Sequence, residues 1–301
     1  MKRNLLLAQF AATPWAITPD YLSLMSGVLT NWALNVPVSA EVTAMIEDDK
    51  QARIDRANSN KNTGSIAVIP IYGVLTQRPP QDISGSGGTS TSNIAIAVKM
   101  AASDPSVSQI LLDLDGPGGS VYGTLEAADE IYKARQLKPI IGVANSMAAS
   151  ATYWLGSQCS EFYCTPGGEV GSIGVYTAHQ YLGEAMKAAG VETTLISAGK
   201  FKTEGNPFEP LSTEAEAAIQ ERVTDYYGMF IQSVARGRGV TVAQVKGGMG
   251  QGRMLGAQAA LDANMIDGIM TFGDVLEKMK SSLRPNRSRL AAAQRDLSLI
   301  Q

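Results

Sequence analysis

Two nearly continuous apolar runs within residues 109–159 decide the fold. The first reads QILLDL at positions 109–114, and the second reads PIIGVA at positions 139–144. A helical pattern follows each run, over residues 122–136 and 151–159. Strands that helices cover on both faces read as continuous apolar runs rather than as alternating ones. The sequence therefore predicts βαβ units and an α/β fold with a mainly parallel sheet and flanking helices.

The same alternation continues on both sides of this stretch. Further strands are predicted at 66–75, 171–176, 193–197 and 269–272, and further helices at 93–102, 182–189, 213–236 and 258–265. We interpret residues 65–280 as a single α/β domain because the pattern runs through them without a long break.

The two ends of the chain differ from this domain in composition. Residues 1–64 are interpreted as an N-terminal arm and linker, with one helix from Pro19 to Leu34. Residues 281–301 carry four arginines and few large apolar side chains, which predicts a basic, disordered tail.

Composition excludes several classes of protein. A net charge of −3 over 301 residues gives no electrostatic reason to bind nucleic acid or an anionic membrane. The apolar start at residues 5–8 stops at Gln9, and no run reaches the roughly 18 apolar residues that a membrane span needs. Cys159 and Cys164 are expected to be reduced thiols, as in a reducing compartment. We therefore expect a soluble, cytoplasmic protein without a membrane span.

Two motifs stand directly after the two apolar runs. DGPGGS occupies residues 115–120, and NSMAAS occupies residues 145–150. Glycines beside Pro117 let the backbone turn sharply and present bare N–H groups, which are the donors of an oxyanion hole. Ser150 stands where a strand becomes a helix, and the N–H groups of a helix N-terminus stabilise a developing anion. Together the motifs predict a serine hydrolase site.

The base that would activate Ser150 is left open by the residues alone. His179 is the only histidine, so a Ser-His-Asp triad must use it or not exist. A lysine can serve instead if its neutral amine is available, and Lys200 and Lys202 follow the predicted strand at 193–197. Two lysines one residue apart on a strand point to opposite faces, so only one of them can reach the site.

Four ordered motifs resemble the signal peptide peptidase A family of serine peptidases. They are residues 115–121, residues 146–153, the stretch VGSIGV at 170–175, and GKFK at 199–202 with GNPF at 205–208. More narrowly, these motifs and the stretch PWAI at 14–17 resemble the bacteriophage head maturation proteases of that family. The resemblance covers residues 65–275 and implies a Clp protease/crotonase-like fold.

The resemblance also implies a role for each site residue. The nucleophile is Ser150 and the base is Lys202, with Lys200 as the fallback. Ser172 would orient the lysine, and the backbone N–H groups of Gly118 and Ala151 would form the oxyanion hole. Such a Ser-Lys dyad needs no metal and no other cofactor.

The function implied is that of a serine endopeptidase that cleaves polypeptides during prohead maturation. Its substrates would be scaffold, capsid or portal proteins, its place the phage prohead or the host cytoplasm, and its state a homo-oligomer. No nucleic acid is expected as a partner.

Three alternatives remain open from the sequence. One is a cellular signal-peptide-peptidase-like protease that digests released peptides, and another is an assembly module without catalysis. The third is a crotonase-like acyl-CoA enzyme, although neither of the two turns carries the glutamate that thioester enolate chemistry needs.

Overall fold

The computed structural model describes residues 10, 13–33, 48, 65–78 and 88–283. Its main sheet has seven strands. Five of them lie in the order β10-β9-β7-β5-β2, while β8 pairs with β7, and β11 pairs with β8. Every pairing in this sheet is parallel except that of β10 with β9. The strands are β2 (Ile66–Tyr72), β5 (Gln109–Gly116), β7 (Ile140–Ala149), β8 (Glu161–Cys164), β9 (Glu169–Gly171), β10 (Met254–Gly256) and β11 (Gly268–Ile269).

A second, smaller sheet holds four short strands in the order β1-β6-β3-β4. They are β1 (Trp15–Ile17), β3 (Leu75–Thr76), β4 (Thr89–Ser90) and β6 (Gly118–Ser120). Because β6 follows β5 after a single residue, Pro117, this sheet lies at the carboxyl end of the central strands. Three residues of the N-terminal region thus pair directly with the first predicted site motif.

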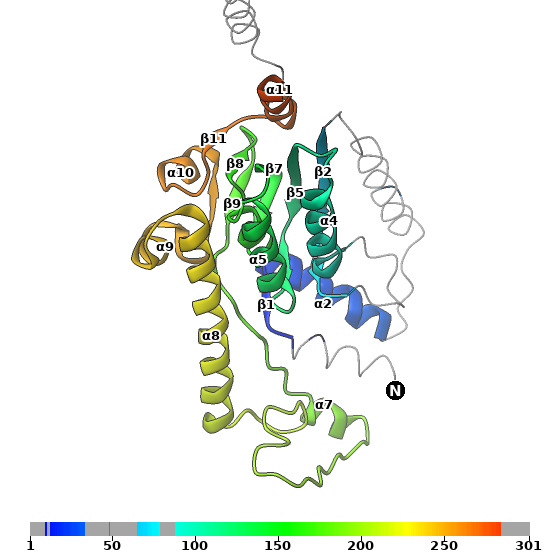
Figure 1. Ribbon diagram of the computed structural model, residues 1–301. Coiled ribbons are helices and arrows are strands. Elements are labelled where there is room, and N and C mark those ends of the chain that lie inside the picture. Colours follow the sequence, from blue (N-terminus) through cyan, green and yellow to red (C-terminus); the bar gives the residue numbers. More distant parts are fainter. Residues whose placement is uncertain (1–9, 11–12, 34–47, 49–64, 79–87, 284–301) are drawn as a thin grey trace, which may run out of the picture.

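Helices cover both faces of the main sheet (Figure 1). On one face, Ile110 and Leu112 of β5 join a core with α4 (Thr91–Ser103), α5 (Thr124–Ala134) and α6 (Ala151–Gly156). On the other face, Leu111 packs with Val143 against α11 (Phe272–Leu283). The predicted α/β fold with a mainly parallel sheet and flanking helices is confirmed.

The remaining helices lie at the edges of this core. They are α2 (Pro19–Ala33), α7 (Gly183–Ala188), α8 (Thr213–Arg238), α9 (Val242–Gly248) and α10 (Ala257–Asp262), with a 3₁₀ turn at Gly250–Gly252. The carboxyl half of α8 is anchored, because Phe230 stacks on Trp154 of α6 with ring centroids 4.4 Å apart. The amino half of α8 extends away from the sheet, toward the segment that contains α7 (Figure 1).

Two predicted strands are wrong. The strand predicted at 171–176 does not form, because β9 ends at Gly171, and residues 193–197 form no strand. We call residues 177–212 the arm. The arm projects beyond the sheet (Figure 1), and Ile196 is 96% exposed. β-branched residues favour strands only where a partner strand and a packed face exist, and the arm offers residues 193–197 neither.

The predicted division of the chain remains a prediction. Most of residues 1–64, the predicted N-terminal region and linker, lie outside the described residues. So do residues 284–301 of the predicted tail. The helix predicted from Pro19 to Leu34 is described from Pro19 to Ala33.

Candidate active site

Ser150 occupies the sharp turn between β7 and α6. Its φ of 52° and ψ of −117° are rare for a residue that carries a side chain. Two backbone hydrogen bonds hold the turn: the Ser150 N–H donates to the Gly171 carbonyl at 2.7 Å, and the Trp154 N–H donates to the Ser150 carbonyl at 2.9 Å. The main chain is therefore held in a strained conformation at the junction of the two elements.

The hydroxyl of Ser150 is buried without a hydrogen-bond partner. The residue is 1% exposed, and its Oγ makes no hydrogen bond within the described part of the chain. An unpaired buried hydroxyl costs free energy, and such groups in native proteins mark functional sites or strain.

Gly118 brings a second backbone segment against this serine. Its φ of 102° lies in the left-handed region, and a β-carbon at this position would come 2.9 Å from Ser150 Cβ and 3.1 Å from the Ala151 amide nitrogen. No side chain fits in that space. The turn after β5 thus lies directly beside Ser150 and the first amide of α6, the arrangement that two oxyanion donors require.

Ser172 lies in the same corner. It follows Gly171, whose carbonyl accepts from Ser150, and its own N–H donates to the Arg253 carbonyl at 2.9 Å. The residue is 7% exposed, with a positive φ of 54°. The structure therefore brings Ser150, Gly118, Ala151 and Ser172 together.

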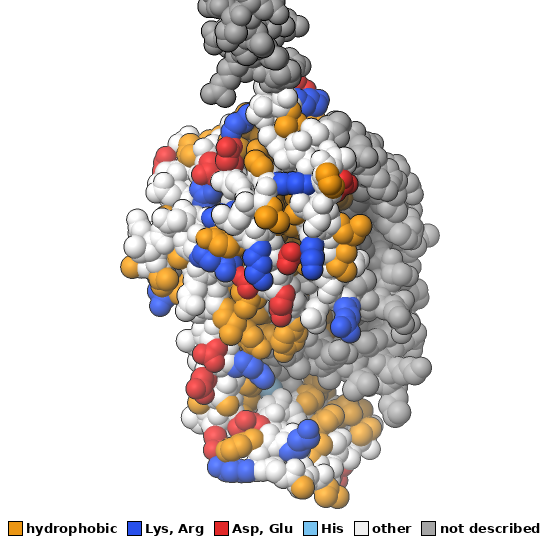
Figure 2. Space-filling view, in the orientation of Figure 1, with side chains coloured by type: hydrophobic (Ala, Val, Ile, Leu, Met, Phe, Trp, Pro, Cys, Tyr) orange, Lys and Arg blue, Asp and Glu red, His pale blue; other side chains and the backbone are white. Residues whose placement is uncertain are grey.

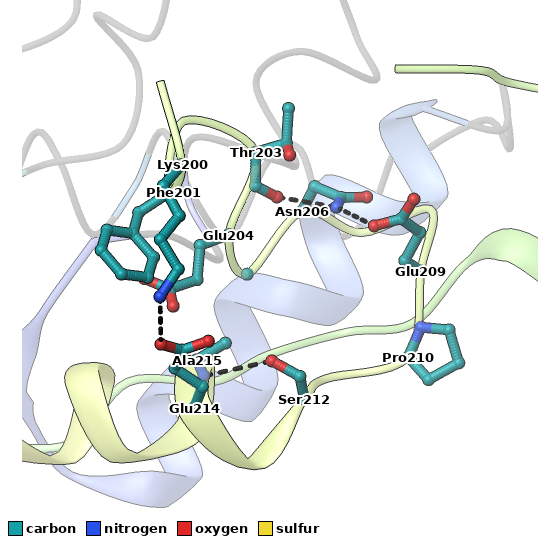
Figure 3. Close-up of a pocket in the computed structure, with 11 residues that line it drawn as sticks. Lys200, Phe201, Thr203, Glu204, Asn206, Glu209, Pro210, Ser212, Glu214 and Ala215 are labelled. Atoms are coloured by element: carbon teal, nitrogen blue, oxygen red, sulfur yellow. Dashed lines mark hydrogen bonds and ion pairs between the residues drawn. The ribbon is translucent and has the colours of Figure 1, made fainter. Parts of the chain in front are cut away.

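The two predicted lysines lie apart from this group. Lys202 is exposed on the arm, and Lys200 forms a surface ion pair with Glu214 at 3.1 Å. Figure 3 shows Lys200 at a cavity of about 180 Å³, which the arm forms with the start of α8. Residues 193–197 form no strand and the two lysines lie in a turn, so they do not point to opposite faces of a strand as predicted.

The single histidine is also remote from the serine. His179 Nε2 lies 3.1 Å from the Asn206 carbonyl oxygen, within the arm, and Ser150 Oγ has no hydrogen-bond partner in the described part of the chain. No His-Ser contact supports a triad in this structure.

Polar residues of the two motifs outside this corner have structural partners. Asp113 accepts hydrogen bonds from Tyr72 and Asn145, and Ser146 donates to Asp115 at 2.7 Å. The hydroxyl of Ser146 is thus engaged in a structural contact. Among the described residues, no cluster of His, Cys, Asp or Glu has the make-up of a metal site.

Sequence reasoning missed the strand β1, which lies against the site. Its residues Trp15, Ala16 and Ile17 are 5%, 0% and 1% exposed. The sequence offers only three apolar residues after Pro14 as a sign of this strand, and three residues are too few to show a strand periodicity. Within the described residues, no helix is both long and apolar enough to cross a membrane.

A model of peptidase family S49 matches residues 133–284 of this chain. The capsid assembly protease C of Escherichia phage lambda is 34% identical over 270 residues, which are 90% of this chain and 61% of that protein. The head-tail preconnector protein GP5 of Enterobacteria phage P21 is 34% identical over 221 residues, which are 73% of this chain and 44% of that protein. The chain thus spans only part of the length of these relatives.

Solved structures show weaker likeness. A mutant of ClpP1 from Listeria monocytogenes has a TM-score of 0.43 and 14% identity, over 74% of this chain and 98% of that chain.

Proposed function

Because this chain belongs to peptidase family S49, we propose that it is a serine endopeptidase with Ser150 as its nucleophile and Lys202 as its base. One observation carries the proposal. The strained and unpaired Ser150 stands beside Gly118 and the amide of Ala151, where a tetrahedral oxyanion would be stabilised.

In the proposed reaction, the neutral amine of Lys202 removes the proton from Ser150 Oγ as the oxygen attacks the peptide carbonyl carbon. The N–H groups of Gly118 and Ala151 stabilise the negative charge on the carbonyl oxygen. Lys202 then protonates the leaving amine, and water hydrolyses the acyl-enzyme. Ser172 is proposed to orient the lysine.

The dyad requires the arm to bring Lys202 to Ser150, either in its own chain or in another copy. The arm exposes large apolar side chains in the lobe at the lower end of Figure 2. They include Tyr181, Leu182, Val191, Ile196 and Phe201, all at least 42% exposed. Exposed apolar patches mark interaction sites, so we propose that the protein acts as a homo-oligomer.

The relatives named for capsid assembly and for the head-tail preconnector support a phage substrate. We propose that the chain cleaves scaffold, capsid or portal polypeptides, in the prohead or the host cytoplasm. Both phage relatives are 34% identical to this chain, whereas a putative signal peptide peptidase SppA of Enterococcus faecium is 26% identical over 75% of it. The higher identity supports this proposal over a cellular peptide-digesting protease.

A fluorophosphonate probe tests the nucleophile directly. We expect the probe to form a covalent bond at Ser150, identified by peptide mapping, and the variant Ser150→Ala to remain unlabelled. The matched control Ser146→Ala removes a hydroxyl from the same motif and should still be labelled. A folded protein that stays unlabelled contradicts the assignment and favours a crotonase-like enzyme or an assembly module. A proteolytically active Ser150→Ala variant refutes Ser150 as the nucleophile.

Four substitutions and one mixture of variants test the base. Lys202→Ala and Lys202→Arg should both lose peptide hydrolysis, since a guanidinium does not give up its proton at working pH. Lys200→Ala should keep activity. If mixing the inactive Ser150→Ala and Lys202→Ala proteins restores hydrolysis, the base acts between copies, and if it does not, the base acts within one chain. An inactive His179→Ala variant beside an active Lys202→Ala variant would refute the dyad.

A further inference from the structure

Strand β1 fills the space between β6 and Tyr176. It runs antiparallel to β6, with Trp15 opposite Ser120, Ala16 opposite Gly119 and Ile17 opposite Gly118. On its other edge, the Trp15 N–H donates to the Tyr176 carbonyl at 2.9 Å, and the Tyr176 N–H donates to the Trp15 carbonyl at 3.0 Å. Backbone groups of two distant parts of the chain, β6 and Tyr176, thus form hydrogen bonds with this three-residue segment on both of its edges.

The same segment lies against the candidate nucleophile. A β-carbon at Gly118 would come 2.2 Å from the Ala16 carbonyl oxygen and 2.9 Å from Ser150 Cβ. The Ala16 carbonyl and Ser150 therefore crowd the same point beside Gly118. An extended peptide that presents a carbonyl to Ser150 and the Gly118 amide would have to run through the space that β1 occupies.

Burial of Ser150 points in the same direction. An endopeptidase nucleophile must meet a peptide from outside, yet Ser150 is 1% exposed and β1 is almost completely buried. By contrast, the helix α2 that follows β1 buries none of its described side chains, and Leu24 and Val28 are 62% and 53% exposed. Among the side chains of β1 and α2 whose burial the structure describes, the buried ones are therefore those of β1.

We propose that Trp15–Ile17 is an internal pseudosubstrate, which occupies the cleft where a substrate polypeptide adds to β6 as an antiparallel strand. The inference rests on the peptidase function proposed above. The substrate must displace β1, and the residue that replaces Ala16 opposite Gly119 enters a position that is 0% exposed. The cleft thus selects extended segments with a small apolar residue at that position.

A reversible disulfide between β1 and β6 tests whether β1 must be displaced. Val121 N–H donates to the Pro14 carbonyl at 3.1 Å, so the next pair, Trp15 and Ser120, is a non-hydrogen-bonded pair of the ladder. Such pairs have Cα atoms about 4.5 Å apart, within the span of a disulfide. The double variant Trp15→Cys with Ser120→Cys therefore joins β1 to β6 on oxidation, and mass spectrometry checks the bond.

The native thiols leave this experiment undisturbed. Cys159 and Cys164 are 1% and 0% exposed, and burial raises the pKa of Cys159 to about 12 and that of Cys164 to about 11. They are therefore protonated and covered at the pH of the assay. Wild type and the Trp15→Cys single variant, taken through the same oxidation and reduction, serve as controls.

The readout is the rate at which a fluorophosphonate labels Ser150. The reduced double variant should label at least about tenfold faster than its oxidised form, because only molecules with an open cleft react. Both controls should label equally in the two redox states. Equal rates for the two forms of the double variant would overturn the pseudosubstrate and leave the peptidase function standing. Absence of labelling in every form, wild type included, refutes both.

Hydrogen exchange on the wild type provides a second measurement if the variant does not fold. After covalent labelling with a peptidyl phosphonate, the amides of Trp15–Ile17 should exchange faster, while β6 stays protected by the bound peptide. Unchanged protection of Trp15–Ile17 in labelled protein contradicts displacement.

Discussion

Removing the proposed nucleophile should abolish activity and at the same time stabilise the protein. Ser150→Ala removes a buried hydroxyl that has no hydrogen-bond partner in the described chain, so no partner is left unpaired. Ser150→Gly removes the same hydroxyl and also relieves the backbone. We therefore expect both variants to be inactive, with the glycine variant the more stable of the two.

The magnitude follows from the backbone angles. At φ 52° and ψ −117°, a residue with a side chain costs about 1–3 kcal/mol relative to glycine. Glycine also increases the conformational entropy of the unfolded chain, which offsets about 0.4–1 kcal/mol of this gain in stability. Ser150→Gly should thus exceed Ser150→Ala in the free energy of unfolding by about 1 kcal/mol, which corresponds to about 2–4 °C in Tm.

Urea denaturation and thermal scans of both variants measure this difference, and Ser157 at the other end of α6 provides the control. Ser157 is as buried as Ser150 but has ordinary helical angles, φ −62° and ψ −16°. There Gly should be less stable than Ala by about 0.5–1 kcal/mol. If Ser150→Gly is also less stable than Ser150→Ala, the backbone of Ser150 stores no strain and the reasoning fails.

Two further predictions concern Gly118, beside Ser150, and the ion pair between Asp267 and Arg238. Gly118→Ala places a methyl group against the Ala16 carbonyl oxygen, Ser150 Cβ and the Ala151 amide, so kcat for peptide hydrolysis should fall about 10²–10³-fold. Gly190→Ala, with a φ of 77° and no atom within 4 Å of the new carbon, should keep kcat. Burial alone would raise the pKa of Asp267, but the Arg238 guanidinium, 2.8 Å away, holds that pKa below its usual value. The pair therefore stabilises the fold above the unfolded pKa of about 4 and loses this contribution as pH falls through the folded pKa. Asp267→Asn should cost about 1–2 kcal/mol at pH 7, a value reduced because the carboxylate is 37% exposed, and the cost should shrink in acid unfolding experiments.

The architecture was predictable because its signal is local. In QILLDL, Ile110 and Leu112 face one core and Leu111 faces the other, so burial on both faces is written in consecutive residues. The proximity of the two motifs was predictable for a related reason: both follow parallel neighbouring strands, and parallel strands end at the same edge of a sheet. The catalytic roles of Ser150, Gly118 and Ala151 remain predictions.

Short strands outside the central sheet were not predictable in this way, because they form only where partners distant in sequence are present. Residues 193–197 have strand propensity, but with Ile196 96% exposed they have no packed face to join and form no strand. Trp15–Ile17 is too short for a pattern, yet it becomes a strand because β6 and Tyr176 supply hydrogen-bond partners on both sides. Those partners are backbone groups, which recognise an extended chain whatever its origin. The feature that made β1 unpredictable from sequence is therefore the one that would let a foreign polypeptide take its place.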